Sequence, residues 1–150
     1  MNLLIGVGAM MIAYAIIFPA MTALTMASPK MFEQMQENRD ILTAILPKAH
    51  PLEFVGAMAA VGVWEELFFR GFLMTRLRRA IGSWIPAVFL SSVLFVLPHA
   101  ITQAPAAMVM IAILSLTMSV VTIWRRSLVP AIVAHALFNL TQVAALYWDQ

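Results

Sequence analysis

Two adjacent carboxylates and one guanidinium interrupt an otherwise apolar part of the chain. Glu65, Glu66 and Arg70 lie in the segment WEELFFRGFL, between long runs of apolar residues. Glu66 and Arg70 are four residues apart with the acid first, which is the favourable order for an ion pair on one helix face. Glu65 is rotated by about 100° around a helix of 3.6 residues per turn, so it lacks that partner. The spacing predicts one neutralised carboxylate and one that is free to act as a general base.

Two histidines occur further along the chain, each with a partner at helical spacing. His99 follows Phe95 in FVLPH, and Asn139 follows His135 in HALFN. Residues four apart share one face of a helix, so each pair should point the same way. Pro98 has no backbone N–H, and we expect it to loosen the helix and re-aim His99. We expect the acidic stretch and the two histidine stretches to meet in one catalytic site.

A carboxylate, two histidines and an amide can activate a water molecule by two routes. In the first, Glu65 and His99 deprotonate a water that attacks a carbonyl, while His135 and Asn139 stabilise the oxyanion. In the second, Glu65, His99 and His135 bind a zinc ion that lowers the pKa of the water. The second route has no HExxH sequence to support it, and its ligands come from three separate helices. Both routes lead to amide hydrolysis, and the sequence leaves the choice between them open.

The elements that must position these groups are membrane-spanning helices. The chain of 150 residues is 63% hydrophobic and 11% charged, and its mean hydropathy is +0.91. Soluble chains are about 45–50% apolar and about 25% charged. The apolar runs are continuous and lack the alternation of a transmembrane barrel. Because an ionisable group at bilayer depth is costly, the three polar stretches mark a functional site by default.

The apolar runs predict an all-α fold, a polytopic transmembrane helical bundle formed by one domain of residues 1–150. At about 20 residues per span, the chain has room for about five spans. We expect them at residues 2–27, 52–77, 85–101, 106–124 and 128–148. The polar stretch from Ser28 to Pro51 predicts a short interfacial amphipathic helix that breaks at Pro47, with a solvated loop as the alternative. Serines and threonines of the fourth span should bond within their helix or pack against neighbours.

Charge and cysteine content narrow the localisation and the partners. Arginines follow the second and fourth spans, so that side of the bilayer should be cytoplasmic. The N-terminus would then be cytoplasmic and the C-terminus outside, in what we expect to be a bacterial or archaeal cell membrane. The chain has no cysteine, which excludes thiolate chemistry. Its net charge of +2, with basic residues at helix ends, suits a membrane lipid environment better than nucleic-acid binding.

The three stretches resemble the motifs of the CAAX protease and bacteriocin-processing (CPBP) family, also called the Abi family of intramembrane proteases. EELFFR is similar to its EExxxR motif, FVLPH to its FxxxH motif, and HALFN to its third motif, a His followed four residues later by Asn or an acidic residue. The resemblance covers residues 52–148, and the motifs agree in order, in spacing and in their placement on separate helices. All three motifs in order within a polytopic chain are quite specific.

The resemblance implies a helical membrane endopeptidase, and the family's eukaryotic members remove the last three residues from prenylated CAAX proteins. It implies that Glu65 and His99 activate the water and that His135 and Asn139 form the oxyanion site. The family is often called a metalloprotease family, but a metal-free glutamate mechanism is also proposed, so zinc stays open as a cofactor. The implied partner is a membrane-anchored or prenylated peptide. Bacterial members are commonly linked to bacteriocin processing or self-immunity.

The resemblance also implies that Glu66 and Arg70 hold the first motif in shape. Family members usually have more spans than this chain, so a homo-oligomer could complete its cavity. Two other function classes fit the same residues, namely a non-catalytic membrane immunity or scaffold protein and a small proton- or ion-coupled transporter. A transporter would more often show pseudo-repeats or broken helices in matching positions, and neither is visible here.

Overall fold

The computed structural model describes residues 1–45 and 51–148, and within these ranges the chain is helical and has no strand. The elements in chain order are α1 (Asn2–Ala27), α2 (Pro29–Ile45), α3 (Pro51–Glu66), η1 (Leu67–Leu73), α4 (Met74–Ile81), α5 (Trp84–Val96), η2 (Leu97–Ile101), α6 (Pro105–Arg125) and α7 (Val129–Trp148). The predicted all-α bundle is confirmed. The polar stretch forms a helix, α2, rather than a loop, while the expected break at Pro47 lies outside the described residues.

Long apolar helices account for most of the expected spans. In the described part of the chain, Asn2–Ala27, Trp84–Ile101 and Pro105–Arg125 are long and apolar enough to cross a membrane, and Val129–Ala145 is a shorter apolar helix. The span expected at residues 52–77 corresponds to three consecutive segments, α3, η1 and α4, and the helical path continues to Ile81. Charged residues within this path distinguish it from the other apolar helices, because charges are rare within transmembrane segments.

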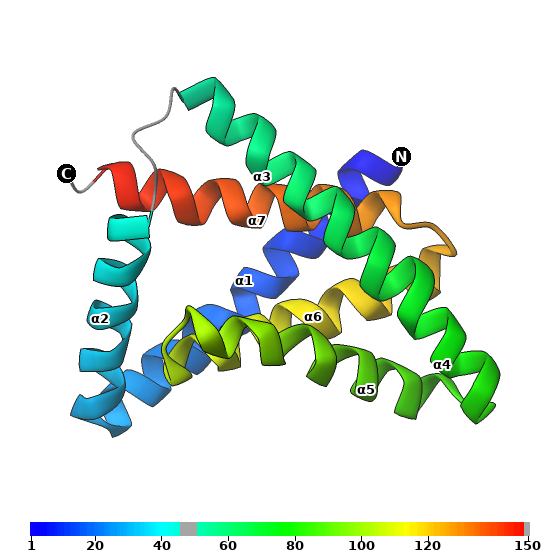
Figure 1. The fold of residues 1–150 in the computed structure, drawn as a ribbon, viewed down its shortest axis with the longest axis horizontal. Helices are drawn as coiled ribbons and strands as arrows, with labels where there is room; N and C mark the ends of the chain where they lie inside the picture. The colour runs from blue at the N-terminus through cyan, green and yellow to red at the C-terminus, as the bar shows by residue number, and fades with distance from the viewer. Residues whose placement is uncertain (46–50, 149–150) are drawn as a thin grey trace.

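The core of the bundle lies where α7 packs against α1 and α6, and α3 also packs against α7 (Figure 1). Small and aliphatic residues of α1, α6 and α7 form its largest buried cluster: Ala9, Ala13, Ile17, Leu114, Met118, Val121, Ala131, Ala134 and Phe138. The small side chains allow the backbones of α1 and α7 to approach closely, as at helix interfaces within membranes. This packing places the middle of α7 against the end of α3, and these two segments carry His135 and the two glutamates.

Two of the motif-bearing segments depart from α-helical geometry. Residues Leu67–Leu73 form a π-helix, in which the N–H of Met74 donates to the carbonyl of Phe69, five residues earlier. Residues Leu97–Ile101 form a 3₁₀-helix that contains Pro98 and His99. The 3₁₀ segment agrees with the predicted loosening at Pro98. The π segment was not predicted, and such insertions are frequent at functional sites.

Candidate active site

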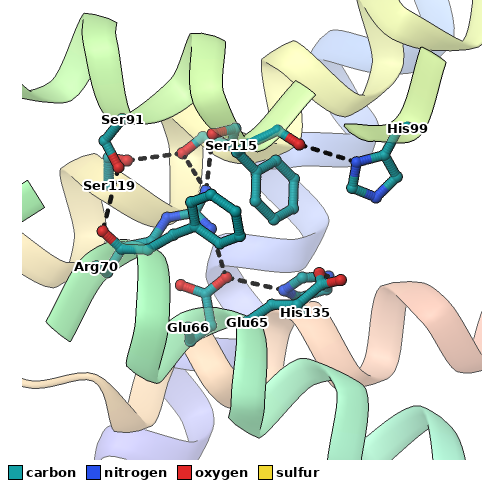
Figure 2. Close-up of polar contacts among 10 residues, drawn as sticks. Glu65, Glu66, Arg70, Ser91, His99, Ser115, Ser119 and His135 are labelled. Carbon is teal, nitrogen blue, oxygen red and sulfur yellow. Dashed lines mark hydrogen bonds and ion pairs between the residues drawn. The ribbon is translucent and has the colours of Figure 1, made fainter. Parts of the chain in front are cut away.

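A fully buried ion pair forms the base of the candidate site. Glu66 and Arg70 are both 0% exposed, and Arg70 Nη1 lies 2.9 Å from Glu66 Oε1. Arg70 Nη2 also donates to Ser115 of α6, at 2.9 Å to the carbonyl and 2.8 Å to Oγ (Figure 2). The predicted pairing of Glu66 with Arg70 is therefore present in the structure. The Arg70 guanidinium also connects η1 to α6 through Ser115. These hydrogen bonds help to offset the large free-energy cost of removing two charges from water.

His135 connects the two glutamates to α7. Its Nδ1 lies 2.8 Å from Glu66 Oε1, and its Nε2 lies 3.4 Å from Glu65 Oε2. The His135 side chain is 4% exposed, whereas that of Glu65 is 24% exposed. Since a carboxylate can only accept, Nδ1 is the donor toward Glu66, and Nε2 faces the more accessible acid. Glu65 is thus the carboxylate of the pair that a substrate or water can reach.

The ring of Phe95 lies among the charged and histidine side chains. Its centroid is 5.1 Å from that of His99 and 5.8 Å from that of His135. Arg70 Cζ lies 4.5 Å from the same centroid, which is a cation–π distance. Phe95 is 2% exposed, so it fills the space between three helices. Phe95 therefore packs beside the histidines of the candidate site.

The backbone of α5 determines which nitrogen of His99 is available for chemistry. His99 Nδ1 lies 2.9 Å from the carbonyl oxygen of Phe95. A carbonyl can only accept, so Nδ1 carries the hydrogen and Nε2 of the neutral ring has a free lone pair. His99 is half-buried and lines a cavity, so this nitrogen is a candidate hydrogen-bond acceptor for a bound water.

The four predicted catalytic residues line a single cavity of about 520 Å³. They are Glu65 of α3, His99 of η2, and His135 and Asn139 of α7. The supporting pair, Glu66 and Arg70, does not line this cavity and lies behind Glu65 and His135. The structure therefore brings the three motifs to one place, and the chemical role of each residue stays a prediction.

The contacts differ in one respect from the arrangement that the first route assumes. Glu65 pairs with His135, whereas no direct contact joins it to His99 in the described part of the chain. His135 is shared between two carboxylates rather than standing beside Asn139 as a separate oxyanion donor. Helical spacing within α7 correctly placed His135 and Asn139 at one cavity, but it held no information about the partners on α3.

The zinc route requires three ligands that converge on one point. Among residues 1–45 and 51–148, no group of three His, Cys, Asp or Glu side chains is placed to hold a metal ion. Both ring nitrogens of His135 face carboxylates, and Nδ1 of His99 donates to a backbone carbonyl. Glu65, His99 and His135 are thus not gathered around one point in this arrangement, and zinc as a cofactor stays a prediction.

Helix α2 forms a wall of the cavity, which the sequence did not predict. Gln36, Asn38 and Arg39 line the cavity together with the motif residues. Asn38 is 4% exposed, and its Oδ1 accepts a 2.6 Å hydrogen bond from the N–H of Ala104. This bond attaches α2 to the turn that follows His99. In the sequence, Asn38 is one polar residue among many in an amphipathic helix. Only its burial in the structure distinguishes it from surface residues.

Ser115 is a second contributor that the sequence did not single out. It was expected to bond within its helix or to pack, like the other hydroxyl residues of the fourth span. Its carbonyl does accept the hydroxyl of Ser119 one turn later, at 2.9 Å. It also holds Arg70 through two hydrogen bonds, so it supports the first motif from a different helix.

Gly62 permits the close approach of α3 and α7 that joins the glutamates to His135. A Cβ at Gly62 would lie 3.1 Å from the backbone nitrogen of Ala136, whereas a Cβ at Gly56 would meet nothing within 4 Å. We expect Gly62→Ala to push α3 away from α7 and to lower activity about tenfold, because small misplacements of catalytic groups have large effects. Gly56→Ala, on the same helix, should retain full activity and gain up to about 1 kcal/mol in stability. Equal activity of the two variants would contradict this account.

Comparison with known proteins connects this site to a family. The family model described as type II CAAX prenyl endopeptidase Rce1-like matches residues 47–141, well over half of the chain. The matched segment contains all three motifs. No curated protein and no solved structure matches the chain. The apolar helices and the family together indicate an integral membrane protein. The chain therefore belongs to the Rce1-like family of type II CAAX prenyl endopeptidases.

Proposed function

We propose that the protein is an intramembrane endopeptidase in which Glu65 and His99 activate the attacking water. The observation that carries this proposal is the shared cavity, where one accessible carboxylate, two histidines and an amide converge within apolar helices. A buried ion pair directly behind Glu65 supports the same proposal, because it neutralises the second carboxylate. Glu65 then remains the acid that can exchange a proton with a bound water.

The proposed reaction begins with a water held between Glu65 and His99 Nε2. Glu65 takes one proton while the water oxygen attacks the carbonyl carbon of the scissile amide, and His99 accepts a hydrogen bond from the remaining O–H. Negative charge develops on the carbonyl oxygen, where the amide N–H of Asn139 stabilises it, while His135 stays beside Glu65. The C–N bond then breaks, and the proton on Glu65 passes to the leaving amine.

The supporting residues act by positioning. Glu66 accepts from His135 Nδ1, so it orients the imidazole and directs Nε2 toward Glu65. Arg70 holds Glu66 in place and is itself held by Ser115. Preorganised groups of this kind stabilise developing charge without having to reorganise during the reaction.

The proposed substrate is a membrane-anchored peptide with a prenylated C-terminal segment. Apolar side chains of α3, α6 and α7 line much of the cavity, including Met58, Val61, Met110, Leu114 and Phe138. Such a lining suits a lipid-modified chain, with a few polar groups to orient the peptide. The family assignment favours a CAAX-type peptide over a bacteriocin-related one.

The test is a cleavage assay with the purified full chain in lipid nanodiscs. The substrates are farnesylated CAAX peptides, the same peptides without the prenyl group, and a membrane-anchored bacteriocin-type leader. We expect cleavage of the prenylated peptides, and we expect it to survive a zinc chelator. Activity that disappears with the chelator and returns with zinc would replace the direct route by a metal route. A folded protein that cleaves no peptide in any lipid mixture would instead favour the non-catalytic immunity or scaffold function.

A further inference from the structure

A second cavity, which Arg70 lines, is separate from the catalytic cavity. It has a volume of about 530 Å³, within the range of about 300–1,000 Å³ that is usual for ligand sites. It opens between α4, α5 and the junction of α6 with α7, and it shares no lining residue with the catalytic cavity. The lining residues that bear on its chemistry are Arg70, Thr75, Trp84, Thr122, Arg126 and Ser127.

The polar groups of this second cavity favour a negatively charged ligand. Two arginines and three hydroxyl residues line it, and no Asp or Glu does. Because Glu66 neutralises Arg70, the positive charge of this lining comes from Arg126. Arg126 forms no ion pair with any residue in the described ranges, and its side chain is exposed. Ser127 Oγ accepts from the N–H of Val129 at 3.3 Å, so its own hydrogen remains available as a donor.

Two buried polar atoms of lining residues lack a partner. Arg70 is 0% exposed and Thr122 is 9% exposed. Arg70 Nε and Thr122 Oγ1 have no hydrogen-bond partner among the described residues, although both nitrogens at the end of the guanidinium are bonded. Because buried donors are nearly always satisfied in folded proteins, a bound acceptor would supply the partner that these two atoms lack.

The backbone at Arg126 is a further sign that its side chain is used. Arg126 caps α6 with φ 49° and ψ 36°, a left-handed conformation. Helices usually place glycine or asparagine at this position, because a Cβ is disfavoured there. An arginine that keeps a strained backbone points to a role for the guanidinium, as strained residues tend to occur at functional sites.

The cavity lies at the basic end of the bundle. The lining residue Thr75 is followed in α4 by three arginines, Arg76, Arg78 and Arg79. Arg78 Cζ is 5.6 Å from the ring centroid of Trp84, another lining residue. Tryptophan is typical of both membrane–water interfaces, and an excess of arginine is typical of the cytoplasmic one. Basic pockets between transmembrane helices at this level bind the headgroups of anionic lipids.

We propose that this second cavity binds a phosphate group, with Arg126 as its main ligand and Ser127 beside it. Phosphate oxygens accept strong hydrogen bonds from a guanidinium, often two at once. Thr122 and Arg70, two further lining residues, each carry a buried donor that has no partner among the described residues. The phosphate can belong to the headgroup of an anionic lipid or to free phosphate, and the two sources are distinguished by experiment.

The test compares Arg126 variants with a variant of equal charge outside the cavity. The purified full chain is examined by native mass spectrometry after exposure to phosphatidylglycerol or phosphatidylcholine, and by calorimetry with inorganic phosphate at constant ionic strength. We expect retention of phosphatidylglycerol, weakened about tenfold in Arg126→Gln and Arg126→Gly, the loss typical of one charge-assisted hydrogen bond. Arg79→Gln should bind like the wild type, because Arg79 does not line the cavity.

The glycine variant separates binding from folding. Because the left-handed backbone suits glycine, Arg126→Gly should unfold at or above the temperature of the wild type. Weaker lipid binding in this variant therefore reports the missing guanidinium rather than a damaged fold. Arg126-dependent binding of inorganic phosphate without lipid retention supports the site with free phosphate as its source. Unchanged binding in both Arg126 variants, or an equal loss in Arg79→Gln, overturns the proposal.

Discussion

Replacing Glu65 by glutamine should lower peptide cleavage by about 10²–10⁴-fold, the range contributed by general acid–base catalysis. Glutamine has nearly the same shape as glutamate but cannot take a proton from water. Glu65 is the carboxylate that reaches the catalytic cavity, and His135 keeps its shorter contact with Glu66 when Glu65 is changed. The measurement is the rate of cleavage of the best prenylated peptide by wild type and Glu65→Gln in the same nanodiscs.

The fold of Glu65→Gln should be intact, so a loss of peptide cleavage would report the missing carboxylate rather than unfolding. Glu65 is the more exposed member of the acidic pair, and its contact with His135 is the longer of the two. Glu65→Gln should therefore unfold close to the temperature of the wild type. Glu33→Gln, on the exposed part of α2, is the matched control and should retain full activity. Cleavage at the wild-type rate in Glu65→Gln would mean that another group activates the water.

Replacing Arg70 by methionine should destabilise the protein by about 3–5 kcal/mol, the effect of removing one partner from a buried ion pair. The change leaves Glu66 buried with a negative charge and removes two hydrogen bonds to Ser115. It should also lower activity, because Glu66 then loses the group that fixes its position toward His135. Unfolding of the purified protein in detergent, followed by circular dichroism, measures the stability.

A double variant tests the cause of that destabilisation. Glu66→Gln removes the stranded charge, so Arg70→Met combined with Glu66→Gln should be more stable than Arg70→Met alone. Removing one member of a buried pair leaves an uncompensated buried charge, whereas removing the charge of both members leaves none. Arg79→Met, at an exposed position of α4, should change stability by less than about 0.5 kcal/mol. Additive losses in the double variant would show that the pairing with Glu66 is not what Arg70 contributes.

The sequence by itself determined the helices and the local pairing within them. Within a membrane, an apolar run of about 20 residues satisfies its backbone N–H and C=O groups by forming a helix. The bounds of α1, α6 and α7 accordingly agree with prediction to within one residue at each end. The Glu66–Arg70 pair follows from a spacing of four residues, which brings side chains together wherever a helix forms. The motif residues could be named for the same reason, since each motif lies within a turn or two of one helix.

Only the tertiary structure decided which groups meet between helices. The contact of Glu66 with His135 spans 69 positions, that of Arg70 with Ser115 spans 45, and that of Asn38 with Ala104 spans 66. Helical periodicity does not predict contacts between residues so far apart in the sequence, because the angle and depth of helix packing depend on all the surfaces in contact. The sequence indicated only that the three motifs meet at one site. Packing of α3 against α7 determined that His135, rather than His99, contacts Glu65, and it added α2 as an unforeseen wall of the cavity.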